Sequence, residues 1–146
     1  MTDANPERLP PGVQLLDHTA DVGLELEAPD LGALFVRAAA GAEALVGPPP
    51  DFEAGLLETV AIRLEADDAA LLLADWLREL LFLRQVRGRS FRDAHFNELT
   101  TTRLSARVRF SAAPAEAMRE IKGVTYHGLE AVREGDSWRA RIIFDV

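Results

Sequence analysis

Residues 59–84 read TVAIRLEADDAALLLADWLRELLFLR, and the fold is deduced from the two hydrophobic periods in this stretch. Up to Ala66, apolar and polar residues alternate, which is the period of a half-buried strand. Asp67 or Asp68 can then cap a helix, because an aspartate side chain accepts hydrogen bonds from the first helical N–H groups. The following apolar positions recur at helical spacing: Leu72, Leu73, Trp76, Leu77, Leu80 and Leu83. The charged positions are expected largely outside that face: Asp75, Arg78, Glu79 and Arg84.

The preceding segment repeats the same order of strand and helix. Residues 22–28 alternate between apolar and polar, which predicts a strand that Pro29 closes, with an alternative start near Val13 to Leu16. Asp30 is placed to cap a helix that Gly47 and the prolines at 48–50 end. The apolar face of this helix consists of Leu31, Leu34, Phe35, Ala38, Ala42 and Leu45.

After Gly88 the pattern is mainly that of strands. They are expected at residues 91–97, 103–111, 121–132 and 138–144, with a loop or a single helical turn at 112–120 and a turn at EGDS, 134–137. The predicted fold class is α+β, in the order β-α-β-α-β-β-β-β. Two helices are expected to cover one face of a mainly antiparallel or mixed sheet, in a single compact two-layer domain over residues 13–146. Residues 1–12 are expected to form a flexible N-terminal arm.

Composition narrows the classes of function. The chain has 146 residues, 24 acidic and 16 basic side chains, a net charge of -8 and no cysteine. Cysteine-ligated metal sites and thiol nucleophiles are therefore excluded, and a surface this acidic disfavours direct binding of nucleic acid. No uncharged apolar run approaches the roughly 18 residues of a membrane span, and the N-terminus does not resemble a signal peptide. A cytoplasmic location is expected.

Three clusters of residues could carry chemistry. Asp17 to Asp21, with His18 and Thr19 between them, gathers ligands for a hard cation, although the same residues are typical of a hydrogen-bonded turn. Asp145 and the terminal carboxylate of Val146 follow an apolar strand, so they form either a fixed set of oxygens or a solvated strand end.

The third cluster surrounds Lys122, at residues 120–127. The lysine lies between apolar residues and could hold an anion or a carboxylate, or it could extend its ammonium group from the surface into water. Other motifs are absent from the sequence: the helical zinc motif, both glycine-rich phosphate loops and the serine nucleophile elbow. The basic stripe of Arg103, Arg107 and Arg109 is interpreted as a solvated sheet face with acidic partners.

Four separated motifs together resemble the archease family. They are HTADVG at 18–23, LLLADWLRELLF at 71–82, EIKGVTYH at 120–127, and the ending W-x5-FDV at 138–146. The resemblance extends from about Leu16 to the last residue. It implies a compact α+β domain that is not itself an enzyme but activates the RtcB-type RNA ligase of tRNA splicing and RNA repair. The implied role is to promote nucleotidylation of the ligase with GTP and to maintain multiple turnover.

The resemblance also implies site residues. A divalent-cation site, with calcium expected and magnesium or manganese as alternatives, is implied at Asp21, Asp145 and the Val146 carboxylate. Lys122 matches a lysine of ligase activation, Glu79 matches the acidic residue of the helical motif, and His18 is expected to face the partner. GTP or ATP is expected at the shared interface, and tRNA is reached only through the ligase.

The sequence departs from the family pattern in two places. Residues 112–120 lack the usual Gly-Glu pair and Lys/Arg-His element, and Gly123 replaces the usual alanine. Two other interpretations remain open. One is a metal-dependent hydrolase that uses Asp21 and Asp145, with His18 as acid or base. The other is a chaperone or RNA-binding module without chemistry of its own.

Overall fold

The computed structural model describes residues 9–17, 21–48, 50–51 and 55–146. These residues form two helices and seven strands. In chain order the elements are β1 (Val13–Asp17), β2 (Asp21–Ala28), α1 (Leu31–Val46), β3 (Leu56–Glu65), α2 (Ala69–Arg87), β4 (Arg89–Leu99), β5 (Arg103–Pro114), β6 (Gly123–Glu134) and β7 (Ser137–Asp145). The two helices and the α+β class are as predicted, and the expected first strand is a pair of strands, β1 and β2.

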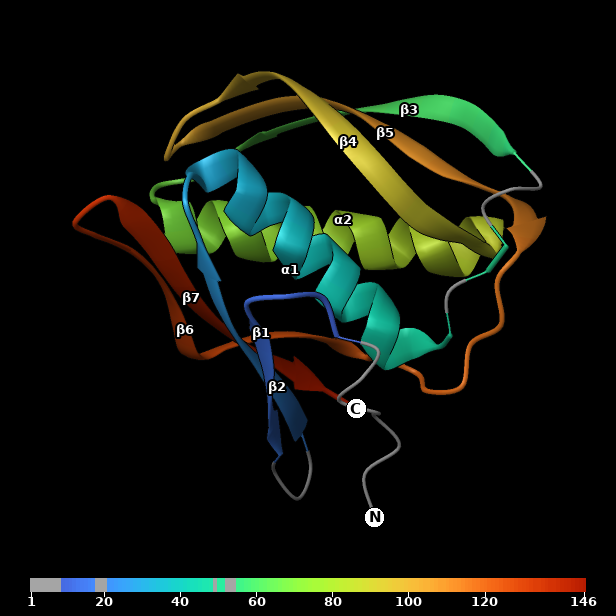
Figure 1. Cartoon of the computed structure of the whole chain (residues 1–146), viewed down its shortest axis with the longest axis horizontal. Helices are drawn as coiled ribbons and strands as arrows, with labels where there is room; N and C mark the ends of the chain where they lie inside the picture. Colours follow the sequence, from blue (N-terminus) through green and yellow to red (C-terminus); the bar gives the residue numbers. More distant parts are fainter. Residues whose placement is uncertain (1–8, 18–20, 49, 52–54) are drawn as a thin grey trace.

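The strands divide between two antiparallel sheets instead of forming the one sheet that was expected. The first sheet has the order β1-β2-β7-β6 and the second β3-β5-β4. The helices lie between them, as Figure 1 shows, so the expected two layers become three. The buried face of α1 explains this arrangement, because it is too wide for one sheet to cover. The buried residues of α1 are Leu34, Phe35, Ala38, Ala39, Gly41, Ala42, Leu45 and Val46.

Local sequence signals fix the ends of the helices. Asp30 accepts a hydrogen bond from the Ala33 N–H at 2.8 Å, which caps α1. Of the two aspartates that could cap α2, Asp68 does so, accepting from the Leu71 N–H at 2.9 Å. Gly88 ends α2 in the left-handed conformation with φ 63°, which a glycine adopts without steric cost. The caps therefore set where each helix meets the sheets.

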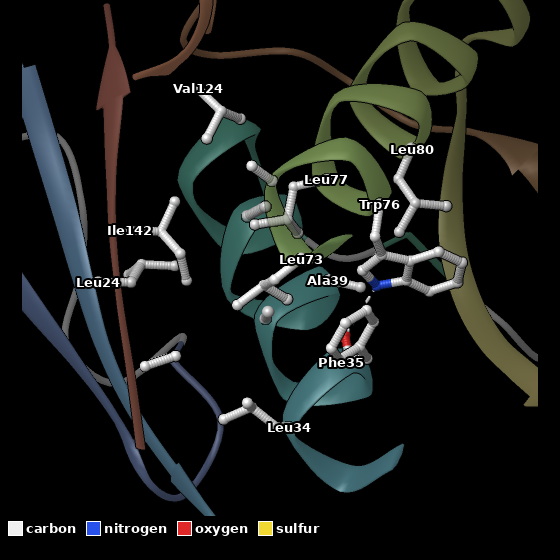
Figure 2. Close-up of a cluster of buried hydrophobic side chains, with 14 of the residues drawn as sticks. Leu24, Leu34, Phe35, Ala39, Leu73, Trp76, Leu77, Leu80, Val124 and Ile142 are labelled. Atoms are coloured by element: carbon white, nitrogen blue, oxygen red, sulfur yellow. Dashed lines mark hydrogen bonds between the residues drawn. The ribbon is translucent and has the colours of Figure 1, made fainter. Parts of the chain in front are cut away.

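The core lies on both sides of the helical layer. Leu24 and Ile142 of the first sheet pack toward the helices, and Trp76 of α2 packs near Phe35 of α1 (Figure 2). The Trp76 indole N–H donates to the Phe35 carbonyl at 3.0 Å, so the buried ring keeps its polar atom satisfied. The alternating positions predicted to face the core do so in β2 and in β5. β5 continues to Pro114, beyond the expected end at Ser111.

Arg84 is a correction to the helix prediction, because it is buried instead of exposed. Only 5% of its side chain is accessible, and its Nε donates to Glu43 Oε2 at 3.0 Å. Its two terminal nitrogens donate to the carbonyl oxygens of Ala115 and Glu116 at 3.1 and 2.8 Å. Hydrophobic periodicity within α2 does not reveal a partner on α1, so the ion pair between Arg84 and Glu43 was not predictable from the spacing of residues. Arg84 thereby fixes the segment that leads to β6.

Candidate functional site

Three strand ends meet at one end of the first sheet. Asp21, the first residue of β2, is the antiparallel register partner of Asp145, the last residue of β7. On the other side of β7, Gly123, the first residue of β6, is also paired with Asp145. Asp21 and Asp145, which are separated by more than a hundred residues in the sequence, are thus neighbours on adjacent strands at the C-terminal end of β7.

Alternation along the strands determines which way the two carboxylates face. Val22 and Phe144 form the next register pair, and both are buried, with 4% and 0% of their surfaces accessible. Successive residues of a strand point to opposite faces, so Asp21 and Asp145 lie on the face turned away from the helices. Directly opposed residues of an antiparallel pair have side chains close enough to act together.

Lys122 joins this pair of aspartates. Its main-chain N–H donates to the Asp145 carbonyl oxygen at 2.7 Å, immediately before β6 begins. Its side chain is exposed, and it is the only lysine in the chain, the other basic residues being arginines. An ammonium group is a compact, strongly hydrated charge that differs from a guanidinium in geometry. The third sequence cluster therefore shares one tip of the sheet with the other two.

The predicted cation ligands at this tip are all carboxylates. Asp21 has a buried carboxylate oxygen, Oδ1, Asp145 is exposed, and Val146 with the terminal carboxylate is half-buried. Carboxylate oxygens are the ligands that calcium and magnesium prefer. Among the described residues, no group of three or more histidine, aspartate or glutamate side chains is arranged to hold a metal. The cation site expected at Asp21, Asp145 and the Val146 carboxylate therefore stays a prediction.

Of the other residues singled out in the sequence, Glu79 and His127 belong to the part of the chain that the structure describes. Glu79 is half-buried on α2. Its neighbour Arg78 reaches β6, where Nη2 donates to the Val124 carbonyl at 3.0 Å, and sequence reasoning treated this arginine only as a charge outside the apolar face. His127 on β6 is exposed. His18 lies outside the described residues, so the role expected for it stays a prediction.

The basic stripe on the second sheet is a solvated face, as interpreted from the sequence. Arg109 Nε donates to Asp93 Oδ1 at 2.7 Å, and Arg103 lies 3.5 Å from Glu65 and 3.6 Å from Glu98. The hydrogen bonds from Arg109 lower the pKa of the Asp93 carboxyl. Two of the three arginines of the stripe, Arg103 and Arg109, therefore have acidic partners.

The segment that departs from the family pattern forms one wall of a cavity of about 310 Å³. Met118 belongs to the segment's share of the lining, and Val46 of α1 and Leu81 and Arg84 of α2 line the cavity as well. The Met118 and Arg119 N–H groups both donate to the Val46 carbonyl, at 2.7 and 3.0 Å. The segment is therefore tied to the end of α1. No helix in the described part of the chain is long and apolar enough to cross a membrane.

Comparison with known proteins covers nearly the whole chain. Residues 14–146 match the archease protein family (MTH1598/TM1083). The chain is 33% identical to the protein archease of Methanopyrus kandleri, an alignment that covers 90% of this chain and 96% of that one. It is 28% identical to the protein archease of Methanosarcina barkeri, over 91% of this chain and 94% of the relative.

Solved structures agree with the sequence match. The solution structure of Methanobacterium thermoautotrophicum protein 1598 superposes with a TM-score of 0.67 and 26% identity, covering 92% of this chain and 99% of the other. The crystal structure of a Thermotoga maritima archease, described as a "possible chaperone", shares the fold with a TM-score of 0.56 at 20% identity, covering 90% and 94% of the two chains. With the family match over residues 14–146 and the shared architecture together, this chain belongs to the archease family.

Proposed function

We propose that this protein is an accessory activator of an RtcB-type RNA ligase in tRNA splicing and RNA repair. The observation that carries the proposal is the meeting of Asp21, Asp145 and Lys122 at one tip of the first sheet. The family resemblance relates Lys122 to activation and the two aspartates to a cation site, and the three residues come from three separate motifs. The role promotes nucleotidylation of the ligase with GTP, or with ATP, and keeps the ligase turning over.

The chain's own residues supply charge and position in this role, not a nucleophile. Lys122 presents an ammonium group that attracts phosphate oxygens, and the hydrogen bond from its main-chain N–H to Asp145 keeps its backbone beside the end of β7. Asp21, Asp145 and the Val146 carboxylate would hold a divalent cation, for which calcium is proposed and magnesium or manganese are alternatives. Such a cation supplies a fixed positive charge that orders anionic oxygens. RNA is reached only through the ligase.

The first experiment is a multiple-turnover ligation assay with the ligase of the same organism, GTP, and RNA ends bearing a 2′,3′-cyclic phosphate and a 5′-hydroxyl. The natural protein is expected to convert a stalled ligase into one that turns over. Lys122→Ala and Asp145→Asn are expected to lose this stimulation. Asp136→Asn is the matched control, because Asp136 is an exposed aspartate in the turn at the opposite end of the β6–β7 hairpin. Equal stimulation by all four proteins would contradict the proposal.

Cation binding has its own test, which does not need the ligase. Labelling with ¹⁵N-lysine yields a single main-chain amide signal, because Lys122 is the only lysine. Its N–H is bonded to the Asp145 carbonyl, so calcium binding at Asp145 is expected to shift that signal, and Asp145→Asn to abolish the shift. A signal that does not respond to calcium, magnesium or manganese would remove the cation from the proposal.

A stand-alone hydrolase is the alternative enzyme, and the same protein preparations test it. Two carboxylates around a cation could activate water, so the hydrolase would release phosphate in the absence of ligase. We expect no cation-dependent release from the isolated protein. Release that Asp21→Asn eliminates would favour the hydrolase over the activator.

A further inference from the structure

Arg78 connects α2 to the beginning of β6 through two contacts, and a third contact holds its guanidinium group on α2. Its Nη1 donates to Asp75 Oδ1 at 3.0 Å, one helical turn earlier, and its Nη2 donates to the Val124 carbonyl at 3.0 Å. The guanidinium carbon also lies 4.6 Å from the centre of the Tyr126 ring, which is cation–π geometry. One side chain therefore holds the residues on both sides of Thr125.

The beginning of β6 depends on such support because its regular pairing is short. Residues 123–125 pair with residues 143–145 of β7, and the next register pair is Glu130 with Arg141. Residues 126–129 interrupt the ladder between these two stretches. Before the interruption, therefore, regular pairing with β7 covers only residues 123–125, the three residues that follow Lys122.

The helix that supplies Arg78 is rigidly held. Its neighbours Leu73, Trp76 and Leu77 are fully buried, each with 0% of its surface accessible. Val124 belongs to the same buried cluster as Leu77 and Ile142, as Figure 2 shows. The side chain of Val124 is therefore fixed in the core, and its carbonyl is fixed by Arg78.

From these contacts the structure assigns a positioning role to Arg78: it holds residues 122–125 so that Lys122 stays beside Asp145. The assignment rests on the proposed function, in which Lys122 and Asp145 act together on the ligase. An arginine suits this task because its planar fork donates in two directions while its face covers an aromatic ring. A lysine at the same place keeps the charge but does not reproduce this geometry.

The first test follows the hydrogen bond between the Lys122 N–H and the Asp145 carbonyl. In ¹⁵N-lysine protein, Arg78→Ala is expected to speed hydrogen exchange of the single lysine amide about tenfold, through local opening of residues 122–125. Arg78→Lys is expected to give an intermediate rate. Arg109→Ala is the matched control, because its guanidinium is bonded to Asp93 on the other sheet. A Lys122 amide that exchanges at the natural rate in Arg78→Ala overturns the assignment, whatever the ligase does.

The second test measures ligation over a range of protein concentrations, with the variants' melting temperatures recorded alongside. A variant that is merely less folded needs more protein to reach the same maximal rate. A mispositioned Lys122 lowers the maximal rate itself, and this is the result expected for Arg78→Ala, with partial recovery in Arg78→Lys. If Lys122→Ala abolishes stimulation while Arg78→Ala keeps the full maximal rate, the positioning role is wrong. If the natural protein gives no stimulation, the proposed function fails, and the amide exchange alone decides the role of Arg78.

Discussion

Glu43 lies where both helices meet β4, and its carboxylate is almost completely enclosed. It accepts hydrogen bonds from the Phe91 N–H at 3.1 Å, the Ser90 hydroxyl at 2.8 Å and Arg84 Nε at 3.0 Å. Burial raises the pKa of this carboxyl above 4.5, and the three hydrogen bonds and the charge of Arg84 only partly oppose the rise. The native protein therefore binds this proton more tightly than the unfolded chain does.

The pH dependence of stability follows from that difference. Because the folded-state pKa of Glu43 is raised, its contribution to stability is fully present at pH values below about 4.5 and is lost as the pH rises through the folded-state pKa. Glu43→Gln has no such titration. The free energy of unfolding of the natural protein, minus that of Glu43→Gln, is expected to fall from acidic toward neutral pH in urea titrations. A difference that grows over this range would show that the pKa is lowered instead.

Gly47 and Gly123 differ in the space that is available for an added side-chain atom. A Cβ added at Gly47 would meet the Glu116 carbonyl oxygen at 2.3 Å, whereas one added at Gly123 meets nothing within 4 Å. Gly47→Ala must therefore displace the segment that Arg84 holds, and it is expected to destabilise the protein by about 1–3 kcal/mol. Gly123→Ala is expected to change stability by less than about 0.5 kcal/mol. Chemical denaturation of both variants measures this, and equal losses would contradict the geometry.

At the scale of elements, the cap of α2 determines where this helix begins. Asp68→Ala removes the acceptor for the Leu71 N–H and is expected to cost about 1 kcal/mol. Asp67→Ala is the natural control, because the neighbouring aspartate is exposed and has the same charge. In urea denaturation, Asp68→Ala should therefore lower the free energy of unfolding more than Asp67→Ala, although both replace an aspartate by alanine. If Asp67→Ala is the more damaging variant, the capping assignment is wrong.

Elements could be predicted from the sequence, but their partners could not. The alternation in β2 and β5 is local, so the buried faces of both strands were predicted correctly. Period-two patterns do not encode which strand pairs with which, and for this reason the division into two sheets was missed. The interruption of β6 at residues 126–129 was missed as well, although Gly128, which has a φ of 67°, is the residue type that marks a bulge in a strand.

For the candidate site too, the sequence indicated which residues matter but not which of them lie together. Residue types alone identified Asp21, Asp145 and Lys122 as three separate clusters, each with a plainer interpretation. Only the family resemblance joined the two aspartates, and the register pairing now gives the physical reason for their proximity. Arg78 carried no signal of its own, since a charged residue outside an apolar face is the common case in any helix.

On the scale of the whole molecule, the net charge of -8 bears on the interaction with a ligase that the proposed function requires. A ligase that binds RNA needs a basic groove, and an acidic protein is drawn to such a groove by long-range attraction. Salt shortens the range of this attraction, to about 10 Å at 0.1 M and about 3 Å at 1 M. The rate of association with the ligase is therefore expected to fall about tenfold or more as salt rises across that range.

The ligation assay separates this effect from the chemistry that follows docking. Higher salt should raise the concentration of the protein needed for half-maximal stimulation, while the maximal rate at saturation changes little. The salt dependence of the ligase alone must be measured in parallel, because its binding of RNA also weakens with salt. If the half-maximal concentration is the same at low and high salt once that control is subtracted, contacts at the tip of the sheet, rather than overall charge, bring the two proteins together. The variants at Lys122 and Asp145 would then be expected to weaken docking itself, and not only the maximal rate.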